Sequence, residues 1–230
     1  MNALDFSVIV DNLPYLWKGL QFSLLLTVVG FSVGIVLGTG LAIVQHLEVP
    51  IAAKLARLYV ALMRSVPLIL VLFWFFLLVP IAIGAITNAG RPVPIGGNWT
   101  AFITFSLFES AYYSEIIRVG LRSVSKGQYE AAQALSLSTF QVYRLVVLPQ
   151  VFWIASPIIL NQTIILFQDT SLVYVLSLTD LVGAASKLAQ LNGRLVETYL
   201  TVAVIYLGIC SAAAQLVAIL RRRSQVLVSR

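Results

Sequence analysis

The chain has 230 residues, of which 60% are hydrophobic and only 10% are charged. Soluble domains carry about 25% charged residues, so this composition cannot build a water-facing surface and lipid must cover much of the chain. The net charge of +6 does not indicate a nucleic-acid partner, because the basic residues lie between apolar runs and form no single basic face. The composition predicts an all-α integral membrane protein.

Five segments are expected to cross the membrane as helices, since a hydrocarbon core of ~30 Å needs about 20 helical residues. Four of them rest on runs without charge, which cover residues 19–45, 65–90, 145–168 and 198–220. The third in chain order, from about Trp99 to Arg118, is interrupted by Glu109 and Glu115. The predicted spans cover residues 17–45, 57–80, 98–119, 149–174 and 196–220, all within a single domain over residues 1–230.

Small residues and prolines mark special positions in these spans. Gly30, Gly34 and Gly38 are spaced by four, so they share one helix face where another helix can approach closely. Pro67 in the second span and Pro157 in the fourth remove backbone hydrogen bonds at membrane depth. Such breaks are tolerated where neighbouring protein or a water-filled cavity satisfies the backbone.

The distribution of Lys and Arg predicts the orientation of the chain. If the N-terminus is outside, the Arg221–Arg223 run, Arg230 and most other basic residues are inside. Only Lys18, Arg91, Lys187 and Arg194 remain outside. Because basic residues are enriched in cytoplasmic connections, we expect the C-terminus to be cytoplasmic.

The longest inner connection, residues 120–148, is polar enough to leave the membrane. It is expected to form short helices around a turn at Gly127. One of these helices would offer Ala131, Ala132, Leu135 and Phe140 to a partner outside the membrane, since an exposed apolar helix face is a common docking element.

A motif within this connection resembles that of a known family. Glu130-Ala131-Ala132 and Leu148-Pro149 stand at the spacing of the Glu-Ala-Ala (EAA) loop of binding-protein-dependent ABC importer permeases. Ser136 stands where that family usually has glycine, which permits a turn that serine adopts less readily. The resemblance implies that this loop couples the chain to an ATPase. The ATPase-coupling residues would be Gly127, Glu130, Ala131, Ala132, Ser136, Leu148 and Pro149.

Further motifs extend the resemblance over nearly the whole chain. The segments 64–68, 111–118 and 168–172 resemble those of the polar amino acid subfamily. The runs 108–118 and 167–178 are similar to those of glutamate/aspartate importer permeases. The resemblance implies a type I importer permease with five spans and a short cytoplasmic coupling helix, multi-pass in a bacterial inner membrane with a periplasmic N-terminus.

The partners also follow from the resemblance. The importer would be completed by a homologous second permease, which is expected to form a heterodimer with this chain. It would also contain two copies of a cytoplasmic ATP-binding subunit and a periplasmic amino-acid-binding protein. The sequence has no Gly-Lys-Ser/Thr of a phosphate-binding loop, so ATP and Mg would bind to the ATPase and this chain would hold no cofactor. No His, Cys and carboxylate cluster has metal-ligand spacing, so no metal is expected.

Polar residues inside the spans are candidates for the substrate path, because a charge in lipid costs at least ~2.5 kcal/mol. Asp169 is the first candidate, since a carboxylate can hold the α-ammonium of an amino acid. Gln162 lies seven residues earlier and shares its helix face. Glu109 either pairs with a basic residue across helices or contacts substrate. The full set of candidates is Arg64, Glu109, Asn161, Gln162, Gln168, Asp169 and Thr170.

The cargo and the class of protein each leave alternatives. The neutral amide of Gln162 would not repel an acidic substrate, which agrees with glutamate or aspartate as cargo. The same architecture would also serve glutamine, asparagine, histidine or arginine. In a different class, the chain would be a membrane scaffold without transport activity or an intramembrane enzyme.

Overall fold

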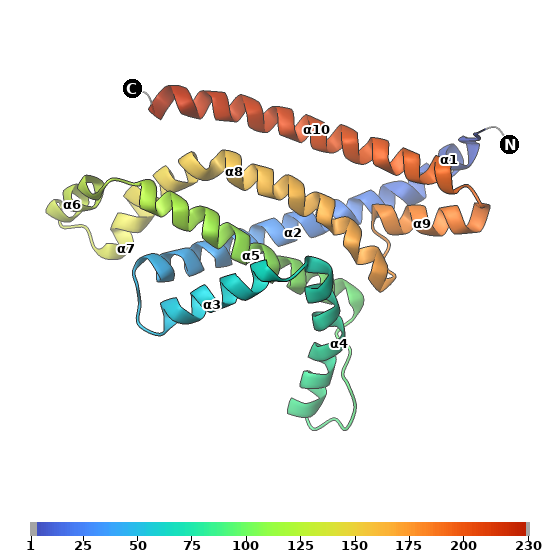
Figure 1. Ribbon diagram of the computed structural model, residues 1–230, viewed down its shortest axis with the longest axis horizontal. Coiled ribbons are helices and arrows are strands. Elements are labelled where there is room, and N and C mark those ends of the chain that lie inside the picture. The colour runs from blue at the N-terminus through green and yellow to red at the C-terminus, as the bar shows by residue number, and fades with distance from the viewer. Residues whose placement is uncertain (1–3, 229–230) are drawn as a thin grey trace.

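The computed structural model describes residues 4–228, with side chains described for residues 4–221. The side chains of Arg222 and Arg223, and all of Arg230, lie outside the described residues. The regular elements of residues 4–228 are helices. The long helices α2 (Leu13–His46), α5 (Gly97–Ser123), α8 (Leu148–Asp169) and α10 (Leu195–Val228) run along the long axis of the molecule (Figure 1).

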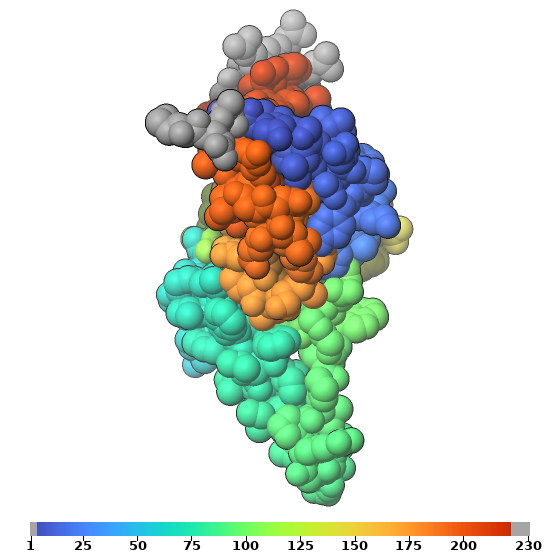
Figure 2. All heavy atoms as spheres, turned by 90° about the vertical axis from the view of Figure 1, so that its right-hand side faces the viewer, coloured from blue at the N-terminus to red at the C-terminus, as the bar shows by residue number. Residues whose placement is uncertain are grey.

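The shorter elements lie at the ends and along one side of this bundle. One end carries α6 (Lys126–Ala134) and α7 (Thr139–Gln141), followed by a π-helical turn, η1 (Val142–Val147). The other end carries α1 (Ser7–Asp11) and α9 (Leu181–Asn192), which follows a 3-10 helix, η2 (Thr170–Leu176). Figure 2 looks onto this second end and shows α4 (Leu68–Ile86) projecting from the body together with the start of α5.

The predicted second span, residues 57–80, is not one helix. It is divided into α3 (Ala52–Ser65) and α4, which meet at an angle (Figure 1). Pro67 disfavours a helical conformation at the preceding residue, and Val66 is extended, with φ −118° and ψ 135°. The predicted break at Pro157 is absent, because α8 continues through that residue. The two prolines therefore act differently, although the sequence predicted a break at both.

Hydropathy identifies fewer spans than expected. Within the described residues, four helical stretches are long and apolar enough to cross a membrane, namely Leu13–His46, Leu68–Ile86, Thr139–Leu176 and Leu195–Arg221. Helix α5 is long enough but is not among them. Its buried residues include many polar side chains: Thr100, Thr104, Ser106, Glu109, Ser110 and Ser114.

The centre of the bundle is the contact between α2 and α5. Gly34 and Gly38 lie on α2 where it meets α5, and a Cβ placed on Gly38 would lie 2.8 Å from the carbonyl oxygen of Ser110. A Cβ on Gly30 would lie 3.4 Å from Leu166 of α8. The three glycines thus let α5 and α8 approach the backbone of α2 closely.

Candidate functional site

A cavity of about 480 Å³ lies where the junction between α3 and α4 faces α8. One wall is the bent segment around Pro67, and the opposite wall comes from α8. Two aromatic residues of α5, Phe108 and Tyr112, complete the lining. Among the polar side chains that line the cavity are three of the predicted substrate-path residues, Arg64, Gln162 and Asp169.

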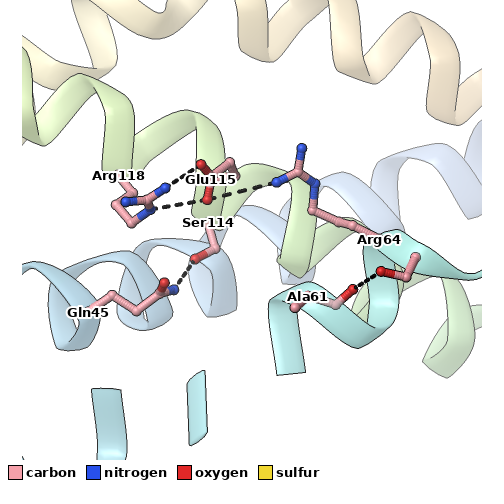
Figure 3. Close-up of polar contacts among 7 residues, drawn as sticks. Gln45, Ala61, Arg64, Ser114, Glu115 and Arg118 are labelled. Atoms are coloured by element: carbon pink, nitrogen blue, oxygen red, sulfur yellow. Dashed lines mark hydrogen bonds and ion pairs between the residues drawn. The ribbon is translucent and has the colours of Figure 1, made fainter. Parts of the chain in front are cut away.

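Arg64 brings a positive charge to this cavity from the last turn of α3. Its guanidinium lies 3.8 Å from Glu115 and 5.5 Å from the ring centroid of Tyr112. Glu115 also accepts hydrogen bonds from Arg118 of its own helix, so Figure 3 shows this carboxylate between two arginines. Since Arg118 already neutralises Glu115, Arg64 retains positive charge that can act on a bound anion.

Asp169 and Gln162 enter the cavity from α8. Their spacing of seven residues places both on the face of α8 that lines the cavity. No residue among 4–221 forms a hydrogen bond or an ion pair with the Asp169 carboxylate. An unpaired carboxylate beside a cavity is suited to bind an ammonium group.

Glu109 lies behind this wall and is fully buried on α5. A basic partner was one of the two alternatives for Glu109, and within residues 4–221 its hydrogen-bond partner is instead an amide. Gln162 Nε2 donates to both carboxyl oxygens of Glu109, at 3.3 and 3.2 Å. Glu109 therefore reaches the cavity through Gln162, without lining it.

The other predicted substrate-path residues do not line the cavity. Asn161 and Gln168 are exposed on other faces of α8. Thr170 is fully buried, and its hydroxyl donates to the carbonyl oxygen of Phe167 at 2.7 Å. Phe108 and Tyr112, which the sequence analysis did not single out, do line the cavity. Their spacing of four residues on α5 is the signal that would have grouped them.

The segment with the Glu-Ala-Ala motif forms α6 at one end of the bundle (Figure 1). Glu130 and Ala131 are exposed, but Ala132 is 4% exposed and packs into the core, which corrects the expectation that it faces a partner. Leu135 and Phe140 are 76% and 70% exposed, so the large apolar side chains offered outward follow α6.

The turn in this segment lies after α6 and not at Gly127, which belongs to the first turn of that helix. Ser136 adopts a left-handed conformation with φ +58°. This is the position where the resembling family has glycine, the residue that adopts positive φ without strain. Leu148 and Pro149 begin α8, so the motif spans two helices and the turns between them.

An aromatic cluster of His46, Tyr129 and Tyr143 links α6 to the bundle. His46 ends α2, Tyr129 lies in α6, and Tyr143 lies in η1. The three ring centroids are 6.0–6.2 Å apart, and His46 Nε2 lies 3.5 Å from the Tyr129 hydroxyl. No spacing in the sequence could have revealed this cluster, because its members come from distant segments. The three rings therefore connect α6 to the end of α2.

Known proteins similar to the chain identify its family. The family model described as "Binding-protein-dependent transport system inner membrane component" matches residues 30–226. The glutamate/aspartate import permease protein GltK of Escherichia coli O6:H1 is 43% identical over 226 residues, covering 97% of this chain and 100% of the relative. The L-cystine transport system permease protein TcyL of Bacillus subtilis (strain 168) is 32% identical over 209 residues, covering 90% of this chain and 86% of the relative.

Solved structures share the fold. One is described as a crystal structure of an amino acid ABC transporter with histidines. It matches with a TM-score of 0.80 and 25% identity, over 96% of this chain and 100% of that one. An inward-facing MetNI methionine ABC transporter matches with a TM-score of 0.67 and 18% identity, over 90% of this chain and 97% of that one, which bears on the fold alone.

Both the family match and the relatives cover most of the chain. A system of this family implies an ATPase and a binding protein as partners. The chain belongs to the family of binding-protein-dependent transport system inner membrane components, as a multi-pass, non-catalytic permease subunit of an ABC transporter.

Proposed function

We propose that this permease carries acidic amino acids, L-glutamate and L-aspartate, across the bacterial inner membrane. The observation that carries this proposal is the cavity that combines Arg64 on one wall with Asp169 and Gln162 on the other. The 43% identity to a glutamate/aspartate import permease protein supports the same cargo.

The cavity chemistry suits an acidic amino acid. Asp169 would hold the α-ammonium group, which every amino acid presents. Arg64 and the first turn of α4 would hold carboxylates. Helix α4 has no side-chain cap, and Leu68 and Ile69 at its N-terminus line the cavity. The positive end of a helix dipole favours an anion, so the break at Pro67 would supply the backbone amides that a carboxylate needs.

The membrane arrangement we infer has five spans in one transmembrane domain, with a periplasmic N-terminus and a cytoplasmic C-terminus. The fifth span, in addition to the four apolar stretches, would be α5, whose length of 27 residues suffices to cross the core. Lys54, Arg57, Arg122, Lys126 and Arg144 would then lie near the inner surface, as the enrichment of basic residues in cytoplasmic connections favours.

The coupling that we propose runs through α6. Two copies of a cytoplasmic ATPase would bind this chain and a homologous second permease, and a periplasmic protein would deliver the amino acid. The exposed Leu135 and Phe140 support a docking role for this end of the bundle. ATP and Mg would remain on the ATPase, and this chain would bind no cofactor.

A charge reversal at Glu130 tests the coupling. Glu130 is exposed, so Glu130→Lys should leave insertion and assembly intact but reduce ATP-driven uptake at least tenfold while ATP hydrolysis continues. Gln133→Lys, also exposed on α6, is the matched control for added charge. Normal uptake by the Glu130→Lys complex would remove Glu130 from the coupling assignment.

The cargo is tested by uptake of labelled L-glutamate into proteoliposomes that hold the complete complex, the binding protein and ATP. We expect aspartate to compete well and glutamine and arginine to compete poorly. Asp169→Asn should reduce uptake strongly with assembly intact, whereas Gln168→Ala, on the exposed face of the same helix, should not. Better competition by arginine or glutamine would replace the acidic cargo with another polar amino acid.

A further inference from the structure

Glu109 is a buried carboxyl group whose position packing does not explain. It is 0% exposed, and α2 closes over it, since a Cβ on Gly34 would lie 3.0 Å from Glu109 Cβ. Burying a carboxyl group costs several kcal/mol unless good partners compensate. Within residues 4–221, its hydrogen bonds come from a single side chain, Gln162.

This contact fixes the orientation of the Gln162 amide. In the structure the amide turns its NH₂ group toward Glu109, and both carboxyl oxygens accept from Nε2. The carbonyl oxygen, Oε1, then points away from Glu109. No donor among residues 4–221 reaches Oε1, and Gln162 lines the cavity. Without Glu109, an amide at this position could present either its NH₂ group or its oxygen to the cavity.

We propose that Glu109 is a positioning residue, which holds the Gln162 amide so that its carbonyl oxygen and the Asp169 carboxylate together receive the ammonium group of the substrate. The inference rests on the proposed function and adds a selection rule to it. The polar groups that α8 presents are then acceptors, which reject a second carboxylate and leave Arg64 and the first turn of α4 on the opposite wall as the carboxylate partners. The cavity thereby distinguishes an amino acid from the same molecule without its amino group.

The test compares L-glutamate with glutarate, which keeps both carboxylates and lacks the amino group. Binding is measured on the complete membrane complex in lipid nanodiscs, without binding protein, by competition with labelled L-glutamate. We expect the wild-type complex to prefer L-glutamate. Glu109→Met removes both acceptor oxygens at similar volume and should lower this preference about tenfold, which is the upper end of what one hydrogen bond contributes. Glu109→Gln keeps one acceptor oxygen and should restore part of it.

A double-mutant comparison separates positioning from a general structural role. If Glu109 acts through the amide, Glu109→Met should change the preference less than twofold in a Gln162→Leu background, because the group to be oriented is gone. Equal effects in both backgrounds would overturn the proposal. If Glu109→Met fails to assemble, Gln162→Asn breaks the same contact from the other side, because its shorter chain withdraws the amide from Glu109. An unchanged preference in that variant would also overturn it.

The outcomes separate this inference from the proposed function. Suppose that the wild-type complex takes up acidic amino acids and prefers L-glutamate to glutarate, and that Glu109→Met leaves this preference unchanged. This result would refute the role of Glu109 but leave the assignment of an acidic cargo intact. The role of Glu109 would also be refuted if the wild-type membrane complex supported uptake but bound no measurable L-glutamate. Failure of the wild-type complex to take up any acidic amino acid would refute the proposed function itself.

Discussion

Helices α5 and α10 are both long enough to cross a membrane, but they differ in what they bury. Helix α10 is strongly apolar, and only 6% of its most apolar 18-residue window is buried within the chain. Helix α5 carries Glu109, Glu115 and several hydroxyl side chains, yet it lies at the centre of the bundle and packs closely on α2. Low hydropathy therefore distinguishes α5, whose polar side chains are packed inside the bundle, from α10, which faces outward.

The packed helix can be polar because its neighbours satisfy its polar groups. Gln45 of α2 donates to Ser114 at 3.0 Å (Figure 3). Gln162 of α8 donates to Glu109. The hydroxyl of Tyr113 lies 3.1 Å from that of Thr163 on α8. An exposed helix has no such partners, so each polar group there would cost its full transfer free energy.

The largest expected effect comes from adding a charge to α10. Leu207 is 66% exposed, and Leu207→Asp should cost about 3 kcal/mol of membrane insertion free energy. The amount of assembled complex recovered from membranes measures this effect. Leu207→Ala is the control, because it shortens the side chain without a charge. Equal recovery of the two variants would show that this face of α10 is not apolar in the assembly.

A smaller effect is expected from adding one methyl group to the packed face of α2. A Cβ at Gly38 would meet backbone atoms of α5 at 2.8 and 2.9 Å, so Gly38→Ala should destabilise the fold by about 1–3 kcal/mol. Gly40 has no atom within 4 Å of the added position, so Gly40→Ala should be neutral or slightly stabilising. Thermal denaturation of the complex measures both, and similar melting temperatures would contradict the close contact.

The smallest expected effect is the pH dependence from Asp180, a fully buried residue outside the apolar stretches. It caps α9 by accepting hydrogen bonds from the N–H groups of Val182 and Gly183, at 2.9 and 3.0 Å. Burial raises its pKa to about 6, although these hydrogen bonds oppose the shift. The folded state therefore holds this proton more tightly than the unfolded state does.

The stability that Asp180 contributes is full below its unfolded pKa, near 4, and is lost as pH rises through about 6. Between pH 5 and pH 7 the loss should be about 1 kcal/mol. Asp180→Asn still caps the helix but does not titrate, so its melting temperature should fall less over this range than that of the wild type. Parallel pH profiles would mean that Asp180 does not titrate there.

The sequence predicted a helix or a turn wherever a single local sequence pattern determines the structure. Charge-free runs located α2, α8 and α10, and the motif around Glu130 located α6. The unusual Ser136 marked a position that requires positive φ. The two prolines could not be told apart, because Pro67 ends a helix whereas Pro157 is accommodated within one.

Parts of the site depend on how helices are rotated about their axes, and a single sequence does not contain this information. The spacing of Gln162 and Asp169 placed both on one face, as the cavity requires. For Glu109 the sequence left a basic partner and substrate contact as alternatives, and it could not anticipate an amide from α8. The aromatic cluster around His46 also depends on contacts between distant segments.

The most direct test of the account is whether water reaches the α8 cavity but not α10. In a Cys210→Ser background, Ile165→Cys lines the cavity and Leu207→Cys lies on the exposed face of α10. With a membrane-impermeant maleimide applied to both sides of the complete complex, we expect Ile165→Cys to react and L-glutamate to slow that reaction, while Leu207→Cys stays unlabelled. Labelling of Leu207→Cys alone, or labelling of Ile165→Cys that L-glutamate does not slow, would contradict a substrate path along α8.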